Sequence, residues 1–144
     1  MARIKLEIPN SLIGSFFIPV RIGDINYGNH VGNDAIVSII HEARVQWLQK
    51  HGYTELDING TGLIMSDLAI EFKKESFYGD LVEVKIYCGE TGRSNFDLFY
   101  ELSAIRTKEP VLLAKAKTGM VCYDYAGKKT VGMPAELMLL LKSV

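Results

Sequence analysis

The stretch from Asn33 to His51 constrains the fold more than any other part of the sequence. Its apolar residues recur at spacings of three and four, the period of an α-helix, and they are Ile36, Ile39, Ile40, Ala43, Trp47 and Leu48. Asn33 or Asp34 is expected to cap this helix, because a short side-chain oxygen accepts the free amide protons of a first turn. Gly52 is expected to end it. Apolar side chains nearly encircle the helix. We therefore expect a sheet to wrap around it, and a partner subunit to bury the apolar surface that the sheet leaves exposed.

Four segments after the helix alternate apolar and polar residues, as half-buried β-strands do. Short turn-forming segments separate them, and consecutive strands joined by short turns form an antiparallel meander. A further strand is expected before the helix, and Pro134 is expected to open a short C-terminal helix. The expected strands are 16–21, 63–71, 81–87, 94–105 and 111–125. The pattern therefore predicts the α+β class, with one antiparallel sheet against one long helix.

The composition fits a single domain spanning residues 1–144. A chain of 144 residues with 48% hydrophobic residues has the size and composition of one globular domain. Its net charge of −1 gives no basic field for nucleic acid or an anionic membrane. No apolar run approaches the ~20 residues that span a bilayer, and no signal-peptide core is evident, so we expect a cytoplasmic protein without a membrane partner. Cys88 and Cys122 are expected to be small core side chains in a reducing compartment.

The usual catalytic and metal-binding motifs are not found in the sequence. It contains no Gly-x-Gly-x-x-Gly, no Gly-x-Ser-x-Gly, no P-loop and no His-Glu-x-x-His. The histidines at positions 30, 41 and 51 have no ligand spacing with cysteine or carboxylate, so no metal site is expected.

The connection between the first strand and the helix, residues 23–34, is long and polar. Its polar residues include Asp24, Asn26, Asn29, His30, Asn33 and Asp34. Long ordered loops tend to carry function. This loop ends at a helix N-terminus, whose free amide protons stabilise developing negative charge. Asn and Asp also suit turn and cap positions, so from spacing alone a purely structural loop is an equal alternative.

The order of these motifs resembles the hotdog-fold acyl-CoA thioesterases of the 4-hydroxybenzoyl-CoA thioesterase family. That family reads Asp-x-Asp-x-x-Gly-His-Val-Asn-Asn and then Glu-Ala-Arg. The matching residues here are Asp24, His30-Val31, Asn33 and Glu42-Ala43-Arg44, with Tyr78-Gly79-Asp80, Gly92-Arg93-Ser94 and Met133-Pro134 as further matches. The resemblance implies a hotdog fold, in which an antiparallel sheet wraps around one long central helix. It also implies hydrolysis of an acyl-CoA thioester to free coenzyme A and a carboxylic acid.

The sequence departs from this family at the residue that carries the chemistry. The family's second Asp, usually assigned as the catalytic carboxylate, aligns with Asn26, and an amide is neither a nucleophile nor a general base. Asp34 is the first candidate replacement, because it falls in the first helical turn, and Asp24 is the second. Asn26 would then orient a water or the carbonyl, and His30 would bind the substrate or brace the loop. The thioester carbonyl is expected to bind backbone amides of Val31, Gly32 and Asn33.

The resemblance also implies partners. The phosphates of coenzyme A favour guanidinium and ammonium groups, and Arg93 resembles the family position near them. Further candidates are Lys73, Lys74, Arg106 and Lys108, each with the alternative of being merely solvated. Family members are dimers or tetramers with the active site between subunits. We therefore expect a homodimer or homotetramer, with a coenzyme A thioester as substrate and no cofactor.

Two other functions remain open at this point. A hotdog hydratase or dehydratase needs a His and an acid in a Pro-rich segment, and no proline lies between His30 and Glu42. A non-hydrolytic acyl-thioester binding module is favoured by the departure at Asn26. Glu42 itself is expected to be a structural helix residue, paired with Arg44 or Arg21.

Overall fold

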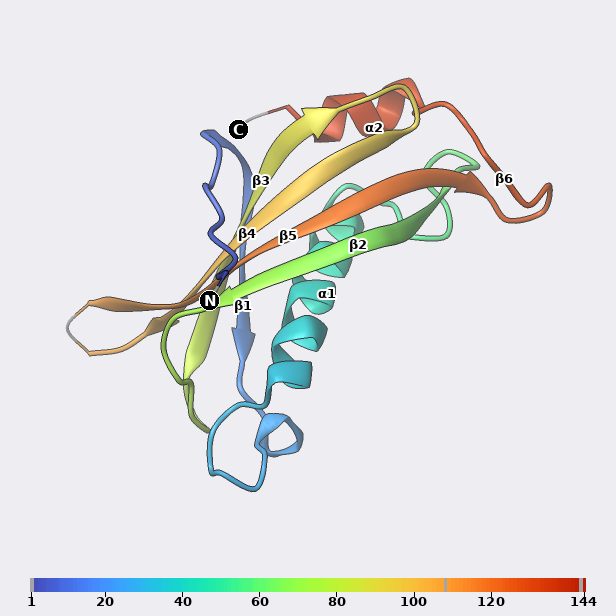
Figure 1. The fold of residues 1–144 in the computed structure, drawn as a ribbon. Helices are drawn as coiled ribbons and strands as arrows, with labels where there is room; N and C mark the ends of the chain where they lie inside the picture. Colours follow the sequence, from blue (N-terminus) through green and yellow to red (C-terminus); the bar gives the residue numbers. More distant parts are fainter. Residues whose placement is uncertain (1, 108, 143) are drawn as a thin grey trace.

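The computed structural model describes residues 2–107, 109–142 and 144, which form one antiparallel sheet and a long helix lying against it (Figure 1). The strands are β1 (Ser11–Pro19), β2 (Gly62–Phe72), β3 (Leu81–Thr91), β4 (Asn95–Ile105), β5 (Pro110–Asp124) and β6 (Lys129–Thr130). The helices are a 3-10 turn, η1 (Ile22–Asp24), the long α1 (Asn33–Lys50) and the short α2 (Ala135–Leu140). The predicted α+β class is confirmed.

The order of strands in the sheet is β1-β3-β4-β5-β2, with β6 paired to β5. The strands β3, β4 and β5 are neighbours both in the chain and in the sheet, as the meander prediction requires. Strands β1 and β2 lie at opposite ends of this order, and α1 connects them in the chain. The helix therefore crosses one face of the sheet, as Figure 1 shows. Its buried side chains pack in one core with the inward side chains of the strands, among them Val84, Ile86 and Leu98.

The helix begins and ends close to the predicted bounds, but its cap differs from the prediction. Gly32 is the N-cap, in an extended conformation and without a side-chain cap, so neither Asn33 nor Asp34 caps the helix. Both lie inside the first turn, where the negative charge of Asp34 is favourable to the helix dipole. At the other end, Gly52 adopts a positive φ of 83°, which a glycine takes without steric cost.

The expectation that apolar residues nearly encircle α1 is wrong. One face of the helix is buried, through Ala35, Ile36, Ile39, Ile40, Ala43, Arg44, Trp47 and Leu48. The opposite face is exposed and mostly polar, with Asp34, Ser38, His41, Glu42, Val45 and Gln49. The helix is therefore amphipathic, and the sheet of the same chain wraps over its apolar face, as the hotdog expectation requires.

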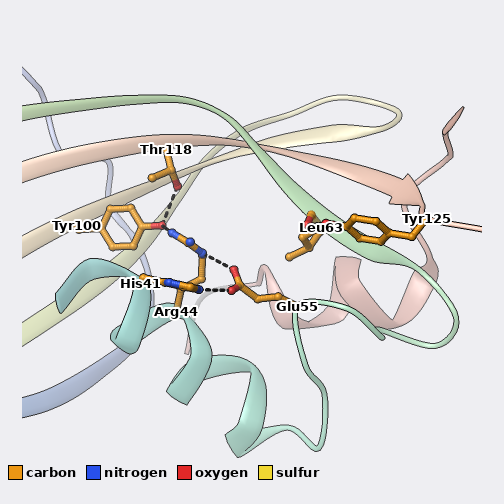
Figure 2. A network of polar contacts seen from close by, with 7 residues as sticks. All are labelled: His41, Arg44, Glu55, Leu63, Tyr100, Thr118 and Tyr125. Atoms are coloured by element: carbon orange, nitrogen blue, oxygen red, sulfur yellow. Dashed lines mark hydrogen bonds and ion pairs between the residues drawn. The ribbon is translucent and has the colours of Figure 1, made fainter. Parts of the chain in front are cut away.

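A buried ion pair links α1 to the connection that follows it (Figure 2). Arg44 Nε donates to Glu55 Oε2 at 2.7 Å, and Arg44 Nη1 donates to the hydroxyl of Tyr100 at 3.2 Å. That hydroxyl is 2.7 Å from Thr118 Oγ1, and His41 contacts the other oxygen of Glu55. Burial raises the pKa of Tyr100, so its hydroxyl stays protonated. The predicted pairing of Glu42 with Arg44 or Arg21 is wrong, because Glu42 instead accepts a hydrogen bond from the neighbouring Gln46.

The bounds of the strands differ from the prediction mainly where hydrogen bonding to a neighbouring strand, rather than the local sequence pattern, sets them. The first strand covers Ser11–Pro19 rather than residues 16–21, because it pairs along β3 from Cys88 to Leu81. Leu102 pairs with Ala114 and Ser103 with Leu112, so Leu113 is the extra residue of a β-bulge in β5. Leu113 and Ala114 are consecutive and both buried, so the bulge breaks the alternation that the sequence predicts.

Cys88 and Cys122 are both free and buried, as predicted for core cysteines. In the described part of the chain, no helix has the length and apolarity needed to cross a membrane.

Candidate active site

The loop between β1 and α1 folds back on itself just before the helix. Ile25 and Val31 form an antiparallel bridge, and the amide of Asn26 donates to the carbonyl of His30 at 2.9 Å. Asn29 adopts a positive φ of 65°, a left-handed conformation that Asn tolerates better than most residues. This tight turn brings Asn26 and His30 next to each other at the N-terminus of the helix.

Two backbone hydrogen bonds anchor the end of this loop. The amide of Val31 donates to the carbonyl of Ser76 at 2.8 Å, and the amide of Gly32 donates to the carbonyl of Asp24 at 3.0 Å. Of the three amides expected to bind a thioester carbonyl, those of Val31 and Gly32 are therefore already engaged.

The free amides lie one step further into the helix. Within residues 2–107, 109–142 and 144, the amides of Asn33 and Asp34 donate no hydrogen bond, whereas the third helical amide, that of Ala35, donates to Gly32. An 18-residue helix concentrates partial positive charge at such a terminus. The amides of Asn33 and Asp34 are thus the donors available to an oxyanion.

A pocket of about 220 Å³ opens at this helix terminus. Its walls come from the loop, from the first turns of α1, from the end of β2 with the segment that follows it, and from β5. The lining residues are His30, Val31, Asn33, Ile36, Phe72, Lys74, Glu75, Ser76 and Leu113. Buried apolar side chains form its base, while polar and charged groups and the half-exposed Phe72 surround its mouth, a pattern typical of small-molecule sites.

His30 presents its Nε2 atom toward this site. Its Nδ1 lies 3.1 Å from the carbonyl oxygen of Val31, and a carbonyl can only accept, so Nδ1 carries the proton. Its other ring nitrogen, Nε2, faces Glu75. Glu75 Oε1 lies 3.9 Å from this nitrogen.

Two glycines mark how close Asn26 lies to His30 and to Asp34. A Cβ placed on Gly28 would be 3.3 Å from both Asn26 Oδ1 and His30 Nε2. A Cβ placed on Gly32 would be 2.6 Å from Asp34 Oδ1 and 3.8 Å from Asn26 Nδ2. The structure thus places Asn26 close to His30 at Gly28 and close to Asp34 at Gly32, and of these three residues His30 is the one that lines the pocket.

Asp24 lies elsewhere. Its Oδ2 accepts the amide of Arg21 at 2.8 Å, and its side chain lines a separate pocket of about 250 Å³ between β1 and α1. Glu42 lines that same pocket, away from His30. Asp34 and Asp24 are the two candidates to replace the family's catalytic carboxylate, which is absent at Asn26. The side chain of Asp34 lies near Asn26, at Gly32.

The candidate cations for coenzyme A have different surroundings. Arg106 pairs with Asp80 at 2.8 Å and stacks over Phe77, which gives it a structural role. Lys73 pairs with Glu71 at 2.6 Å, whereas Lys74 lines the pocket of His30. Lys108 lies outside the described residues.

Arg93 lies at the far end of β3 from this site. Its turn follows Thr91, whereas the segment that contacts the loop precedes Leu81. A strand of 11 residues spans about 33 Å. One copy of the chain therefore does not bring Arg93 to the pocket of His30.

The segment between β2 and β3 is a part of the site that sequence reasoning missed. Asp80 Oδ2 accepts the hydroxyl of Ser76 at 2.8 Å and the amide of Phe77 at 2.9 Å, while Arg106 donates to both oxygens of Asp80 and to the carbonyl of Glu75. These bonds fix the carbonyl of Ser76 that receives the amide of Val31. The Tyr78-Gly79-Asp80 motif was the local signal for this turn, but nothing in it indicates contact with the loop.

No metal site is evident in the described ranges, where no group of three or more His, Cys, Asp or Glu residues is arranged to hold an ion.

The family of the chain follows from its similarity to known proteins. Residues 20–141 match the family model of the thioesterase-like superfamily. A candidate esterase of Aquifex aeolicus (strain VF5) is 33% identical over 103 residues, which cover 70% of this chain and 76% of that protein.

Solved structures of thioesterases have the same fold. The 1,4-dihydroxy-2-naphthoyl-CoA thioesterase from Synechocystis superposes with a TM-score of 0.79 at 22% identity, covering 88% of this chain and 93% of that one. An Asp-to-Asn variant of 4-hydroxybenzoyl-CoA thioesterase, complexed with 4-hydroxybenzoyl-CoA, gives a TM-score of 0.79 at 17% identity, covering 89% and 97%. The chain has the hotdog fold of these enzymes, and it belongs to the thioesterase-like superfamily.

Proposed function

We propose that this chain hydrolyses an acyl-CoA thioester, releasing free coenzyme A and a carboxylic acid, at the pocket of His30 and Asn33. The observation that carries the proposal is the pair of free amides, from Asn33 and Asp34, at the N-terminus of α1 beside this pocket. Membership of the thioesterase-like superfamily supports the same reaction.

The amides of Asn33 and Asp34 bind the carbonyl oxygen of the thioester. As a water oxygen adds to the carbonyl carbon, negative charge collects on that oxygen, where fixed N–H donors and the helix dipole stabilise it. Collapse of the tetrahedral intermediate breaks the C–S bond. The leaving thiolate of coenzyme A then takes up the proton that the attacking water gave up.

Asp34 is the base that takes this proton. Its Oδ1 lies beside Asn26, whose amide cannot accept a proton but can orient the water. His30, which lines the pocket, binds the water or the substrate. Lys74, at the mouth of the pocket, offers a positive charge to the coenzyme A portion.

A second copy of the chain adds groups outside the mouth of the pocket. Among the described strands, β2 pairs with β5 alone and is an edge of the sheet, with Met65 and Phe72 exposed along it. An exposed edge with apolar side chains invites pairing with another strand. Because Phe72 also lines the pocket of His30, a partner on β2 stands next to the substrate. Arg93, remote within one copy, would then act from another subunit of a dimer or tetramer.

The other candidate is a non-hydrolytic acyl-thioester binding module, which the amide at Asn26 favours. The Asp-to-Asn variant of 4-hydroxybenzoyl-CoA thioesterase is itself complexed with its thioester. A hydratase is less well supported, because Glu42 and His30 line different pockets.

The Asn33 amide can be removed without disturbing the helix. Asn33 is the first helical residue, a position that proline favours, and Gly32 before it has φ −70° and ψ 157°, which suit a residue preceding proline. We expect Asn33→Pro to lower kcat about 100-fold in a thiol-release assay, because one oxyanion donor is lost. Asn33→Ala, which keeps the amide and loses only the side chain, is the matched control and should retain most activity. Equal losses in both variants would contradict the role of the amide.

The choice between hydrolase and binding module needs a panel of acyl-CoAs. Thiol release by the wild type, lost in Asp34→Asn and kept in Asp57→Asn, supports hydrolysis with Asp34 as base. Asp57, in the connection after α1, uses its oxygen to accept the amide of Gly60, which Asn also does. Saturable binding without thiol release would establish the binding module, and water addition to an enoyl-CoA would establish the hydratase.

A further inference from the structure

The pocket of His30 is closed at its base by side chains that belong to the core. Val31 and Ile36 are each 5% exposed and Leu113 is 1% exposed. Leu113 reaches this position because the bulge in β5 turns it to the same side of the sheet as Ala114. Since these residues are packed against the rest of the core, the base of the pocket does not open into a tunnel.

The mouth of the pocket is formed by different kinds of groups. Phe72, the last residue of β2, is a large apolar side chain at the mouth and is 51% exposed. Lys74 and Glu75, also at the mouth, carry charges of opposite sign. An acyl chain that outgrew the pocket would have to pass Phe72 or lie against these charges.

The volume limits what the pocket can hold. A cavity of about 150 Å³ lined by apolar side chains accommodates one benzene molecule. If each carbon atom needs the same volume as in that cavity, the pocket of about 220 Å³ holds about nine carbon atoms. A single aromatic ring or a short aliphatic chain fits, whereas a 16-carbon chain does not.

We propose that the site takes compact acyl groups, either one aromatic ring or a chain of up to about nine carbons, and that Phe72 sets the upper limit. The inference rests on the proposed function, because the carbonyl must lie at the Asn33 amide for the acyl group to enter this pocket. To the proposed function it adds the size of the acyl group that the site accepts and a residue, Phe72, that determines this specificity.

Rates on acyl-CoAs of graded size test this proposal. The probes are butanoyl-, hexanoyl-, benzoyl-, dodecanoyl- and hexadecanoyl-CoA, and the readout is kcat/KM for thiol release. We expect hexanoyl- and benzoyl-CoA to exceed hexadecanoyl-CoA by about 100-fold. Phe72→Ala should raise the ratio of dodecanoyl to hexanoyl rates about tenfold, the lower end of what one methylene contributes in an apolar pocket.

Phe17→Ala is the matched control. Phe17 lies on β1, is 52% exposed, and is not among the residues that line this pocket. It should leave the ratio unchanged. A wild type that prefers the long acyl-CoAs, an unchanged ratio in Phe72→Ala, or an equal shift in Phe17→Ala would each overturn the proposal.

A second readout separates this proposal from the proposed function. S-hexyl-CoA and S-hexadecyl-CoA are thioethers that no hydrolase cleaves, so calorimetric binding reports acyl size without catalysis. A folded protein that binds S-hexyl-CoA more tightly but releases no thiol would overturn the hydrolysis and keep the size limit. Tighter binding of S-hexadecyl-CoA in the wild type would overturn the size limit while leaving hydrolysis intact.

Discussion

At the scale of single residues, the site depends on two glycines that leave room for other side chains. Gly28 and Gly32 have no Cβ, and the space that a Cβ would fill borders Asn26 at both positions. His30 occupies the rest of the space at Gly28, and Asp34 occupies it at Gly32. Asn26 can therefore lie close to His30 and to Asp34, because the backbone between them has no side chain in the way.

Gly32→Ala tests the position of Asp34 without changing a charge. The new methyl group would lie 2.6 Å from Asp34 Oδ1 and must displace it, and because this carboxylate is exposed the shift costs little stability. We expect thiol release to fall at least about tenfold, since small displacements of a reacting group are costly. Gly23→Ala, where a Cβ meets nothing within 4 Å, is the control. Full activity in Gly32→Ala would argue against Asp34 as the base.

At the scale of elements, two polar clusters hold connections in place around α1. Asp80 and Arg106 fix the turn that receives the amide of Val31, and so act on the loop of His30 from outside the pocket. Arg44 and Glu55 fix the connection after the helix. One cluster supports the site, and the other supports the fold.

The pH dependence of stability identifies the contribution of Asp80. The guanidinium of Arg106 holds the pKa of Asp80 below its ordinary value of 3.8. A carboxylate with a lowered pKa stabilises the fold fully above the unfolded value, and this contribution is lost as the pH falls through the folded value. We expect Asp80→Asn to lower the free energy of unfolding by about 1 kcal/mol at pH 7. In urea titrations the difference from the wild type should shrink below pH 3.8, and a constant difference down to pH 2 would contradict the ion pair.

Loss of Glu55 is expected to destabilise the protein more strongly. Arg44 has a side chain only 6% exposed, so Glu55→Ala leaves a buried charge without its partner. The expected cost is about 3 kcal/mol in the free energy of unfolding, measured by urea denaturation. The double variant Arg44→Met, Glu55→Ala removes both charges and should recover most of this loss. If the double variant were as unstable as Glu55→Ala, the cost would come from packing rather than from the charge.

At the scale of the whole molecule, the edge strand β2 lies beside the candidate site. Phe72 belongs both to this edge and to the pocket of His30, so a second copy on β2 would affect the substrate directly. The exposed polar face of α1 makes the helix itself a poorer candidate for a large apolar interface.

Met65→Lys tests whether β2 is the interface. Met65 is 41% exposed on this edge, and a lysine there opposes edge-to-edge pairing. We expect a dimeric or larger mass for the wild type by light scattering, and a shift toward the monomer in the variant, with a loss of thiol release in proportion. Leu139→Lys, on the short C-terminal helix and exposed at 64%, is the control. An unchanged mass in Met65→Lys would move the interface away from β2.

The sequence by itself determined the class of the fold and the location of the loop. The three-and-four spacing of α1 and the alternation in the later strands follow from local periodicity, and local periodicity can be read from the chain. The helix N-terminus near Asn33 also follows locally, as does the presence of Asp34 in the first turn.

Only the tertiary structure decided which of these residues form one site. The amides of Val31 and Gly32 are engaged because Ser76 and Asp24 lie opposite them, and no local pattern indicates those contacts. The bulge that turns Leu113 into the pocket depends on the pairing of β4 with β5. Hydrogen-bond partners and strand register join residues far apart in the chain, so they are fixed when the sheet assembles rather than by any one segment.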